Sequence, residues 1–587
     1  MNYDLSQFSG RAKSKTPTFA ALKKLLAFMS EERRKLYFAL SAILINAAIN
    51  LVGPFIIGHA IDKFVQTKQY KGVLIYSGML LVLYVIGLLA SYLQTKLMGG
   101  VGQRLLFKLR NGLFSKLLEL PVAFFNQNKA GDLISRVNND TDKLNQFFSQ
   151  SLMQFISSIF MMAGAGIFLL SINLKLGAAA LGPALLLWIF TRLISPWVKQ
   201  KNAMNLKSTG SMSAEIQESL NNFKVIVAFN RRDYFRAKFQ EANDRNYSAG
   251  IGAGFANTIF IPVYGLCSNA AQLIVLVFGI FLVGSGQFTI GLLISFIAYV
   301  NNFYNPLRQL AALWANFQLA LAGWDRISQI LSLESDMGIA VDTKNVAPSS
   351  LLEFRNVHFS YPGGKEVLQE INFNLEKSKT YAFVGPTGGG KTTTASLIAR
   401  LYDPTSGVIL VNGRDLRTFS AEERSREIGF ILQEPFLFSG SVKDNILYGN
   451  EYYKDHSNLQ LEEAIRDANL DGLLSRFETG LESKVTVSGD GISLGQKQLI
   501  AFMRAVLRKP QLLILDEATA NIDTITEKLL EGILQNLPGE TTLVIIAHRL
   551  NTIENADEIF FVNSGQVIRA GSLDDAVNML LHGERKS

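Results

Sequence analysis

The chain is poor in charged residues and nearly without cysteine. Only 18% of its 587 residues are charged, whereas soluble domains carry about a quarter, so a single soluble domain is excluded. The one cysteine, Cys267, lies in an apolar stretch, which excludes an intrachain disulfide and a cysteine-based metal site and predicts a small buried hydrophobic residue. The first 30 residues lack the apolar core and cleavage site of a secretory signal peptide, so we expect the N-terminus to stay where it is made.

Long stretches of the first half lack Asp, Glu, Lys and Arg altogether. A helix of 20 such residues crosses the roughly 30 Å hydrocarbon core of a bilayer, and a large soluble core would instead need charged faces recurring within each helix. A turn signal at 284–287 divides the longest stretch, Asn246–Leu307, in two. We therefore predict six membrane spans, with the first four at Leu36–Ile61, Gly72–Thr95, Leu144–Leu174 and Leu176–Thr191.

The positive charge is concentrated in two connections. The segments between spans two and three and between spans four and five carry most of the Lys and Arg of this half, whereas the outer turns hold Lys63, Lys68, Lys71 and Lys175. This bias predicts that both termini and both long connections are cytoplasmic. Apolar residues at helical spacing predict that the connections extend the spanning helices. The charge is thus explained without nucleic acid, and no basic cluster with stacking aromatics argues for it.

A soluble domain follows a polar linker. We place a cytoplasmic segment at 1–35, a six-helix transmembrane domain at 36–324, a linker at 325–350 and a second domain at 351–587. In the last domain short β-rich runs alternate with helical stretches, which is typical of an α/β fold with a mainly parallel sheet that binds ligands at the carboxyl ends of its strands. These runs are Leu352–Phe359, Thr380–Val384, Ile428–Leu432, Leu512–Leu515 and Thr542–Ile546.

The second of these runs leads into the sequence GPTGGGKT, which fits the P-loop pattern G-x-x-x-x-G-K-[ST], and a helix is expected at Thr393–Leu401. Glycines let backbone N–H groups close around phosphates, and the helix N-terminus adds positive potential. We expect Lys391 to reach the β and γ phosphates and Thr392 to bind Mg²⁺. The residues expected around the nucleotide are Gly385, Pro386, Thr387, Gly388, Gly389, Gly390, Lys391, Thr392 and Thr393.

Two further strand ends carry residues suited to phosphoryl transfer. The run Leu512–Leu515 ends in Asp516 and Glu517; one carboxylate can hold Mg²⁺ and the other can orient the attacking water. We assign these roles to Asp516 and Glu517 in that order. The run Thr542–Ile546 is followed by His548, whose imidazole can contact a γ-phosphate, although a lone histidine is more often structural.

With these residues in order, the chain resembles the ATP-binding cassette (ABC) exporters along nearly its whole length, as a half-transporter with six spans and one nucleotide-binding domain. The resemblance implies that Tyr361, in the run FSYP, stacks on adenine, and that Gln433, in LQEP, contacts Mg²⁺ and water. It also implies that Asp523, in ANID, lies in a loop crossing the dimer interface and that His548 is the switch histidine. Phe124–Asn126, in the first connection, resembles the segment that contacts a nucleotide-binding domain, and Glu215–Phe229 resembles its counterpart in the second.

One family motif is altered. Ile492–Gln496 reads ISLGQ where the family has Leu-Ser-Gly-Gly-Gln, so Leu494 replaces a glycine between Ser493 and the pair Gly495 and Gln496. This motif closes the ATP site of the opposite subunit at a helix N-terminus. A side chain at 494 would crowd the phosphate or meet a backbone angle that only glycine adopts. We therefore favour one subunit of a heterodimer, with a homodimer and a tolerated substitution as the alternatives.

The resemblance implies ATP-driven export by alternating access, with Mg²⁺ as cofactor. Two ATP molecules would close a pair of cassettes and turn the spans outward, and hydrolysis would reset them. Five of the spans lack charges, which favours apolar or amphipathic substrates of multidrug type, and the fusion of both domains favours an exporter over an importer. We expect it in a bacterial plasma membrane. The polar residues of spans one and six face a cavity or join helices: Asn46, Asn50, His59, Asn301, Asn302, Tyr304 and Asn305. Alternatives are an ATP-gated channel or sensor and a dedicated lipid or peptide exporter.

Overall fold

The fold was analysed in a computed structural model of the whole chain. The residues that the structure describes are 2–5, 30–340, 350–486, 492–516, 524–535, 537, 540–546 and 553–582. The described chain divides into two units. One unit, the cassette unit, comprises 1–10, 118–130 and 333–587, and the other, the helical unit, comprises 11–117 and 131–332. A short piece of the first connection, 118–130, therefore belongs with the cassette.

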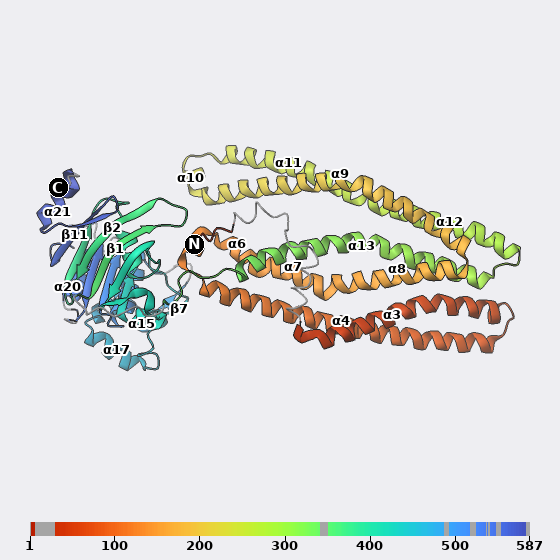
Figure 1. The fold of residues 1–587 in the computed structure, drawn as a ribbon, viewed down its shortest axis with the longest axis horizontal. Coiled ribbons are helices and arrows are strands. Elements are labelled where there is room, and N and C mark those ends of the chain that lie inside the picture. Colours follow the sequence, from red (N-terminus) through yellow and green to blue (C-terminus); the bar gives the residue numbers. More distant parts are fainter. Residues whose placement is uncertain are drawn as a thin grey trace. The chain divides into compact units, whose positions relative to one another are not determined.

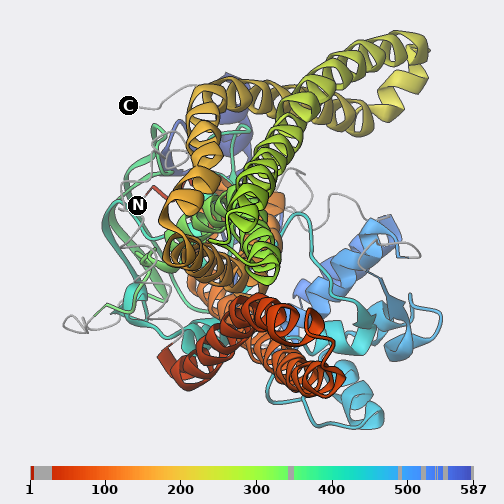
Figure 2. The ribbon, with the colours of Figure 1, turned by 90° about the vertical axis from the view of Figure 1, so that its right-hand side faces the viewer.

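The helical unit consists of long helices that follow the apolar runs. Its longest members continue far beyond a membrane thickness, as the apolar spacing in the connections predicts: α4 (Tyr70–Glu119), α9 (Leu174–Asn221) and α13 (Ile290–Leu331). Helices α9 and α11 run side by side and are joined through α10 in both views (Figures 1 and 2). The others are α3 (Arg33–Ala60), α6 (Ala130–Ser135), α7 (Thr141–Gln146), α8 (Leu152–Ile172), α10 (Phe223–Ala228), α11 (Arg232–Thr258) and α12 (Phe260–Gly284), with short helical turns at Ser30–Glu32, Ile61–Val65, Arg136–Asp140 and Phe147–Ser151.

The predicted turns lie where polar residues can end a helix. Asn173 separates α8 from α9, and its side chain accepts a hydrogen bond from the backbone of Leu176. Helix α12 ends at Gly284 and α13 begins at Ile290, where the side chain of Thr289 caps its first turn. Both breaks agree with the sequence-based expectation.

Five helical segments among the described residues are long and apolar enough to cross a membrane. They are Arg33–Val65, Tyr70–Glu119, Ala130–Ile172, Leu174–Asn221 and Arg232–Gly284. Helix α13 forms a sixth long helix, but Asn301, Asn302 and Asn305 lower its hydropathy. The chain is thus a membrane protein with several spanning helices, and the sixth span stays a prediction.

Polar contacts fasten α13 to other helices of its unit at two places. Near its start, Asp62 accepts hydrogen bonds from the Thr289 hydroxyl at 2.5 Å and from the Gly291 amide at 2.7 Å, so a carboxylate caps the helix N-terminus. Near its end, Arg326 pairs with Asp132 and with the buried Asp140. Because buried charges are costly unless paired, these contacts fix α13 against the helical turn Ile61–Val65 and against the helical turns after α6.

The described residues of the cassette unit form three sheets. The six-stranded sheet has the order β12-β11-β3-β10-β9-β6, and all neighbours are parallel except β12 against β11. Its strands are β3 (Thr380–Val384), β6 (Ile428–Ile431), β9 (Leu512–Asp516), β10 (Thr542–Ile546), β11 (Glu558–Asn563) and β12 (Gln566–Arg569). The others are β1 (Leu352–Ser360), β2 (Glu366–Leu375), β4 (Ser406–Val411) and β5 (Arg414–Asp415), which form an antiparallel sheet, and the pair β7 (Gly440–Ser441) and β8 (Lys484–Val485).

The predicted α/β fold with a mainly parallel sheet is confirmed, with one correction. The first β-rich run, Leu352–Phe359, belongs to the separate antiparallel sheet rather than to the parallel one. The cassette unit also contains helices, of which Figure 1 labels α15, α17, α20 and α21. Its helices are α5 (Val122–Gln127), α14 (Lys391–Ile398), α15 (Ala421–Glu427), α16 (Val442–Ile446), α17 (Asn458–Asp467), α18 (Asp471–Leu474), α19 (Leu494–Val506), α20 (Thr524–Gln535) and α21 (Leu573–His582), with single turns at Leu416–Thr418 and Gly480–Glu482.

Candidate ATP site

The loop after β3 has the shape that its glycines allow. Gly388 and Gly390 have φ angles of +82° and +118°, which side chains rarely permit. Helix α14 begins at Lys391, two residues before the predicted Thr393, and directly follows Gly390. Lys391 is 5% exposed, and its ammonium group donates hydrogen bonds to the carbonyls of Gly385 and Pro386 at 2.8 and 3.1 Å. The predicted phosphate-binding lysine therefore lies against its own loop.

The two residues predicted to bind the metal are neighbours. Thr392, on the first turn of α14, donates a hydrogen bond from its hydroxyl to Oδ1 of Asp516 at 3.4 Å. Asp516 is the last residue of β9 and is 2% exposed. A hydroxyl and a buried carboxylate are the hard oxygen ligands that Mg²⁺ takes beside a nucleotide, so these side chains fit the cofactor.

Gln433 follows β6 at the same edge of the sheet. Strand β6 pairs with β9 through Ile431 and Leu515, so residues just beyond both strand ends lie at one edge of the sheet. The Gln433 side chain is exposed, and its backbone carbonyl accepts a hydrogen bond from Gln498 on α19 at 3.4 Å. Three other predicted site residues, Glu517, Asp523 and His548, lie outside the described residues.

The predicted adenine-stacking tyrosine lies beside the phosphate-binding loop. The hydroxyl of Tyr361 hydrogen-bonds the Thr393 hydroxyl at 3.1 Å, and its ring meets Tyr402 edge-on with centroids 5.2 Å apart. A partly exposed ring held in this way can stack on a base.

Replacing Tyr361 should weaken ATP binding more than hydrolysis at saturation. Stacking on a base contributes about 1–3 kcal/mol, so we expect Tyr361→Ala to raise the dissociation constant for ATP about tenfold in calorimetric titrations. Tyr361→Phe keeps the ring and should stay within about threefold of the wild type. Tyr452→Ala, at an exposed tyrosine of the same unit, is the control. Unchanged affinity in Tyr361→Ala would exclude the stacking role.

The altered family motif begins a helix. Ser493 caps α19, its hydroxyl accepting from the Gln496 amide at 3.2 Å while the Gln496 side chain accepts from the Ser493 amide at 3.0 Å. Leu494 is the first residue of the helix, is 41% exposed and is not among the residues with positive φ. The expectation of a glycine-only backbone angle at 494 is therefore wrong. Of the two ways in which Leu494 was expected to impair an ATP site, crowding of the phosphate by its side chain is the one that stays a prediction.

Helix α5, from the first connection, contacts the cassette as the Phe124–Asn126 pattern predicts. Asn126 donates a hydrogen bond from Nδ2 to the Tyr402 hydroxyl at 2.6 Å. Burial raises the pKa of Tyr402 above its ordinary value, against a smaller opposite effect of the Asn126 hydrogen bond, so the phenol is neutral at pH 7. Tyr402 thus touches both Asn126 and Tyr361, and sequence reasoning missed it because a lone tyrosine after α14 carries no motif.

The polar residues of spans one and six are partly used in helix contacts. Asn302 donates to the carbonyl of Asn50 at 3.2 Å, Gln272 donates to Asn301 at 2.9 Å, and the Tyr304 hydroxyl donates to the carbonyl of Ala180 at 2.9 Å. Cys267 is half-buried against this core, in keeping with the structural role expected of it. Hydrogen bonding between helices, the second of the two interpretations, is therefore confirmed for these side chains.

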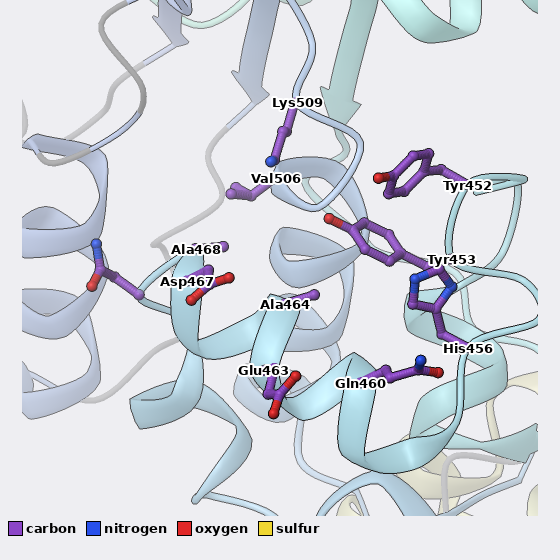
Figure 3. A pocket seen from close by; sticks show the side chains of 11 residues that line it. Tyr452, Tyr453, His456, Gln460, Glu463, Ala464, Asp467, Ala468, Val506 and Lys509 are labelled. Carbon is purple, nitrogen blue, oxygen red and sulfur yellow. The ribbon is translucent and has the colours of Figure 1, made fainter.

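A separate cavity of about 620 Å³ lies beside α17 and the end of α19. Figure 3 shows Tyr452 and Tyr453 on one side of it and Lys509 and Val506 on the other. It shares no lining residue with the phosphate-binding loop, so it is not part of the candidate ATP site.

The fold and site together define an ATP-binding membrane transporter with both domains in one chain. Residues 36–307 match the family model "ABC transporter transmembrane region", and residues 368–520 match "ABC transporter". An uncharacterized ABC transporter ATP-binding protein of Bacillus subtilis, YfiC, is 36% identical over 97% of this chain and 93% of its own length. The chain belongs to the ABC transporter family.

Other relatives are fusions of the same kind. A fatty acid ABC transporter ATP-binding/permease protein of Mycobacterium bovis is 34% identical over 84% of this chain and 77% of its own length. A probable multidrug resistance ABC transporter ATP-binding/permease protein of Bacillus subtilis, YheH, is 29% identical over 87% and 75%. The chain is therefore an ATP-binding ATPase coupled to transport, with the architecture of a half-transporter exporter that pairs with a second subunit or with a copy of itself.

Proposed function

We propose that the chain exports apolar or amphipathic compounds across a bacterial plasma membrane, with both termini and the cassette on the cytoplasmic side. The observation that carries the proposal is the meeting of Lys391, Thr392 and Asp516 at one sheet edge, in a chain whose other unit supplies apolar helices. The substrate class is supported by the lack of charge in most spans and by the printed names of relatives that handle fatty acids or confer multidrug resistance.

The chemistry follows from the residues around the loop. Lys391 would hold the β and γ phosphates once its ammonium group turns from the loop carbonyls, and loop amides would surround the same oxygens. Thr392, Asp516 and Gln433 would hold Mg²⁺, which neutralises charge on the phosphates. Glu517 would orient the attacking water, and His548 would contact the γ-phosphate. ATP drives the cycle because it binds the closed cassette pair better than the open one.

We further propose that the partner is a different half-transporter. In an ATP site between two cassettes, α19 of one subunit faces the γ-phosphate of nucleotide held by the other. Leu494, exposed at the first turn of α19, would crowd the site that it completes, while the loop and Asp516 of this chain would meet an intact motif on the partner. One site would then hydrolyse ATP and the other would chiefly bind it.

Shortening Leu494 should therefore release activity in the chain alone. We expect wild-type chain purified in lipid to hydrolyse ATP slowly, and Leu494→Gly to raise the rate about tenfold, because a crowded phosphate site gains room. Leu494→Ile keeps the volume and should stay slow. Addition of a second half-transporter with an intact motif should raise the wild-type rate, and Glu517→Gln in this chain should remove that gain. Fast, Glu517-dependent hydrolysis by the wild-type chain alone would contradict the heterodimer.

The export proposal is tested in inverted membrane vesicles containing this chain and its partner. ATP should drive accumulation of ethidium or of a fluorescent long-chain fatty acid, and Lys391→Met in this chain should stop it. Accumulation of neither probe, with ATP hydrolysis intact, would overturn the substrate class proposed here. Uncoupled ion conduction under the same conditions would favour an ATP-gated channel with the same architecture. Movement of phospholipid or peptide, without either probe, would favour a dedicated lipid or peptide exporter.

A further inference from the structure

The residues at the start of the chain are buried in the cassette unit although they lie far from it in sequence. Tyr3 is fully buried and Leu5 is 2% exposed. We call residues 2–5 the strap. The structure places it between helix α5 and the segment 334–336, which follows helix α13. Burial of two large side chains within four residues indicates that the strap occupies a specific place in the cassette unit.

One side of the strap is bound to the first connection. The Tyr3 amide donates to Oε1 of Gln127 at 2.8 Å, and the Leu5 amide donates to Oδ1 of Asn128 at 3.0 Å. Asn128 returns a hydrogen bond from Nδ2 to the Tyr3 carbonyl at 2.9 Å and donates another to the Phe124 carbonyl at 2.8 Å. The rings of Tyr3 and Phe124 meet edge-on with centroids 6.3 Å apart. The strap thus binds the end of α5 through its backbone and one ring.

The other side of the strap is bound to the start of the cassette. The Tyr3 hydroxyl donates to Oδ1 of Asp336 at 2.6 Å and accepts from the Asp336 amide at 3.0 Å. Burial, aided by the hydrogen bond to Asp336, raises the pKa of Tyr3 to about 12. The phenol is therefore neutral at physiological pH and can donate its hydrogen bond to the Asp336 carboxylate. One side chain joins α5 to the segment that leads into the cassette.

Helix α5 needs such support because it is short. It has six residues, begins after Pro121 and has no side-chain hydrogen bond at its N-cap, whereas isolated helices below about 12 residues are marginal. Its outward contact, Asn126 to the Tyr402 hydroxyl, leads to the ring of Tyr361. A change at Tyr361, which we propose to stack on adenine, can therefore reach α5 through Tyr402 and Asn126.

We propose that Tyr3 and Leu5 are positioning residues for α5. The strap then joins α5 and Tyr402 as a third component of the contact through which nucleotide binding is transmitted to the spans. This rests on the proposed function, in which ATP binding drives the helices. Without the strap, α5 loses the seat that keeps Asn126 at Tyr402. ATP would still bind and be hydrolysed, but fewer transport events would follow each hydrolysis.

The test compares Tyr3→Ala and Tyr3→Phe in the full-length chain with its partner, with Tyr452→Ala as the control at an exposed tyrosine of the same unit. We expect Tyr3→Ala to speed amide hydrogen exchange in 122–128 at least tenfold. It should leave the KM for ATP within twofold and lower the ethidium or fluorescent fatty acid moved per ATP hydrolysed at least fivefold. Tyr3→Phe keeps the ring beside Phe124, so most of the coupling should be retained.

The possible results separate the two proposals. Unchanged exchange in 122–128 of Tyr3→Ala would overturn the strap itself. Faster exchange with an unchanged ratio of probe to ATP would overturn its role in coupling, and so would a fall in transport fully matched by a fall in hydrolysis. If wild-type protein moves neither probe, the proposed function fails instead, and the exchange measurement alone decides whether the strap holds α5.

Discussion

Lys391→Met should lower ATP hydrolysis by at least about 100-fold, which corresponds to about 2.7 kcal/mol at the transition state. The methionine keeps the apolar stem of a side chain that is 5% exposed but removes the ammonium group now donating to Gly385 and Pro386. No other positive charge at that position of the loop would then face the phosphates. The measurement is phosphate release by the purified chain with its partner in lipid.

The control for this substitution is Lys454→Met, at an exposed lysine of the same unit that pairs with Glu451. It should hydrolyse ATP at the wild-type rate. The matching substitution in the partner, whose loop holds the site that Leu494 would crowd, should lower hydrolysis less and is tested in parallel. Hydrolysis by Lys391→Met at more than about a tenth of the wild-type rate in the pair would contradict the role proposed for this lysine.

Asp516→Asn should also reduce hydrolysis by at least about 100-fold. The substitution keeps the shape of a side chain that is 2% exposed, yet it removes the negative charge that Mg²⁺ requires, while an amide can still accept a hydrogen bond from Thr392. Purified protein should show an unchanged melting temperature and a weaker response of hydrolysis to added Mg²⁺.

The comparison for Asp516→Asn is Asp467→Asn, on the exposed surface of α17. It removes the same charge from the same unit and should leave hydrolysis unchanged. If Asp516→Asn hydrolysed ATP with the wild-type dependence on Mg²⁺, the carboxylate would not hold the metal, and the pair formed with Thr392 would be structural only.

Four strands of the six-stranded sheet could be predicted, namely β3, β6, β9 and β10, whereas β11 and β12 were not, and β1 was predicted as a strand but not as part of a separate antiparallel sheet. Strands β3, β9 and β10 are buried on both faces and read as short continuous apolar runs, so their bounds agree with the prediction within one residue. Strand β1 alternates buried and partly exposed residues, which is the pattern of a sheet with one solvated face. That alternation was visible in the sequence, and it explains why β1 belongs to another sheet.

The site was predictable where spacing within one motif fixes the geometry. The loop glycines, Lys391 and Thr392 follow β3, and Asp516 ends β9, which is separated from β3 by β10 alone in the same parallel sheet, so topology brings them together. Tyr402 and Tyr3 could not be found in this way. Their partners Asn126 and Asp336 lie hundreds of residues away in sequence, and no local pattern records a contact of that kind.

ATP-driven export requires a fixed ratio between the ATP hydrolysed and the substrate moved. That ratio is obtained by measuring phosphate release and uptake of ethidium or a fluorescent long-chain fatty acid in the same proteoliposomes, containing this chain and its partner. We predict that hydrolysis rises at least about twofold with one of the probes and that both activities are lost together in Lys391→Met. A rate of hydrolysis that neither probe changes, or probe movement that persists in Lys391→Met, would contradict ATP-driven export by this chain.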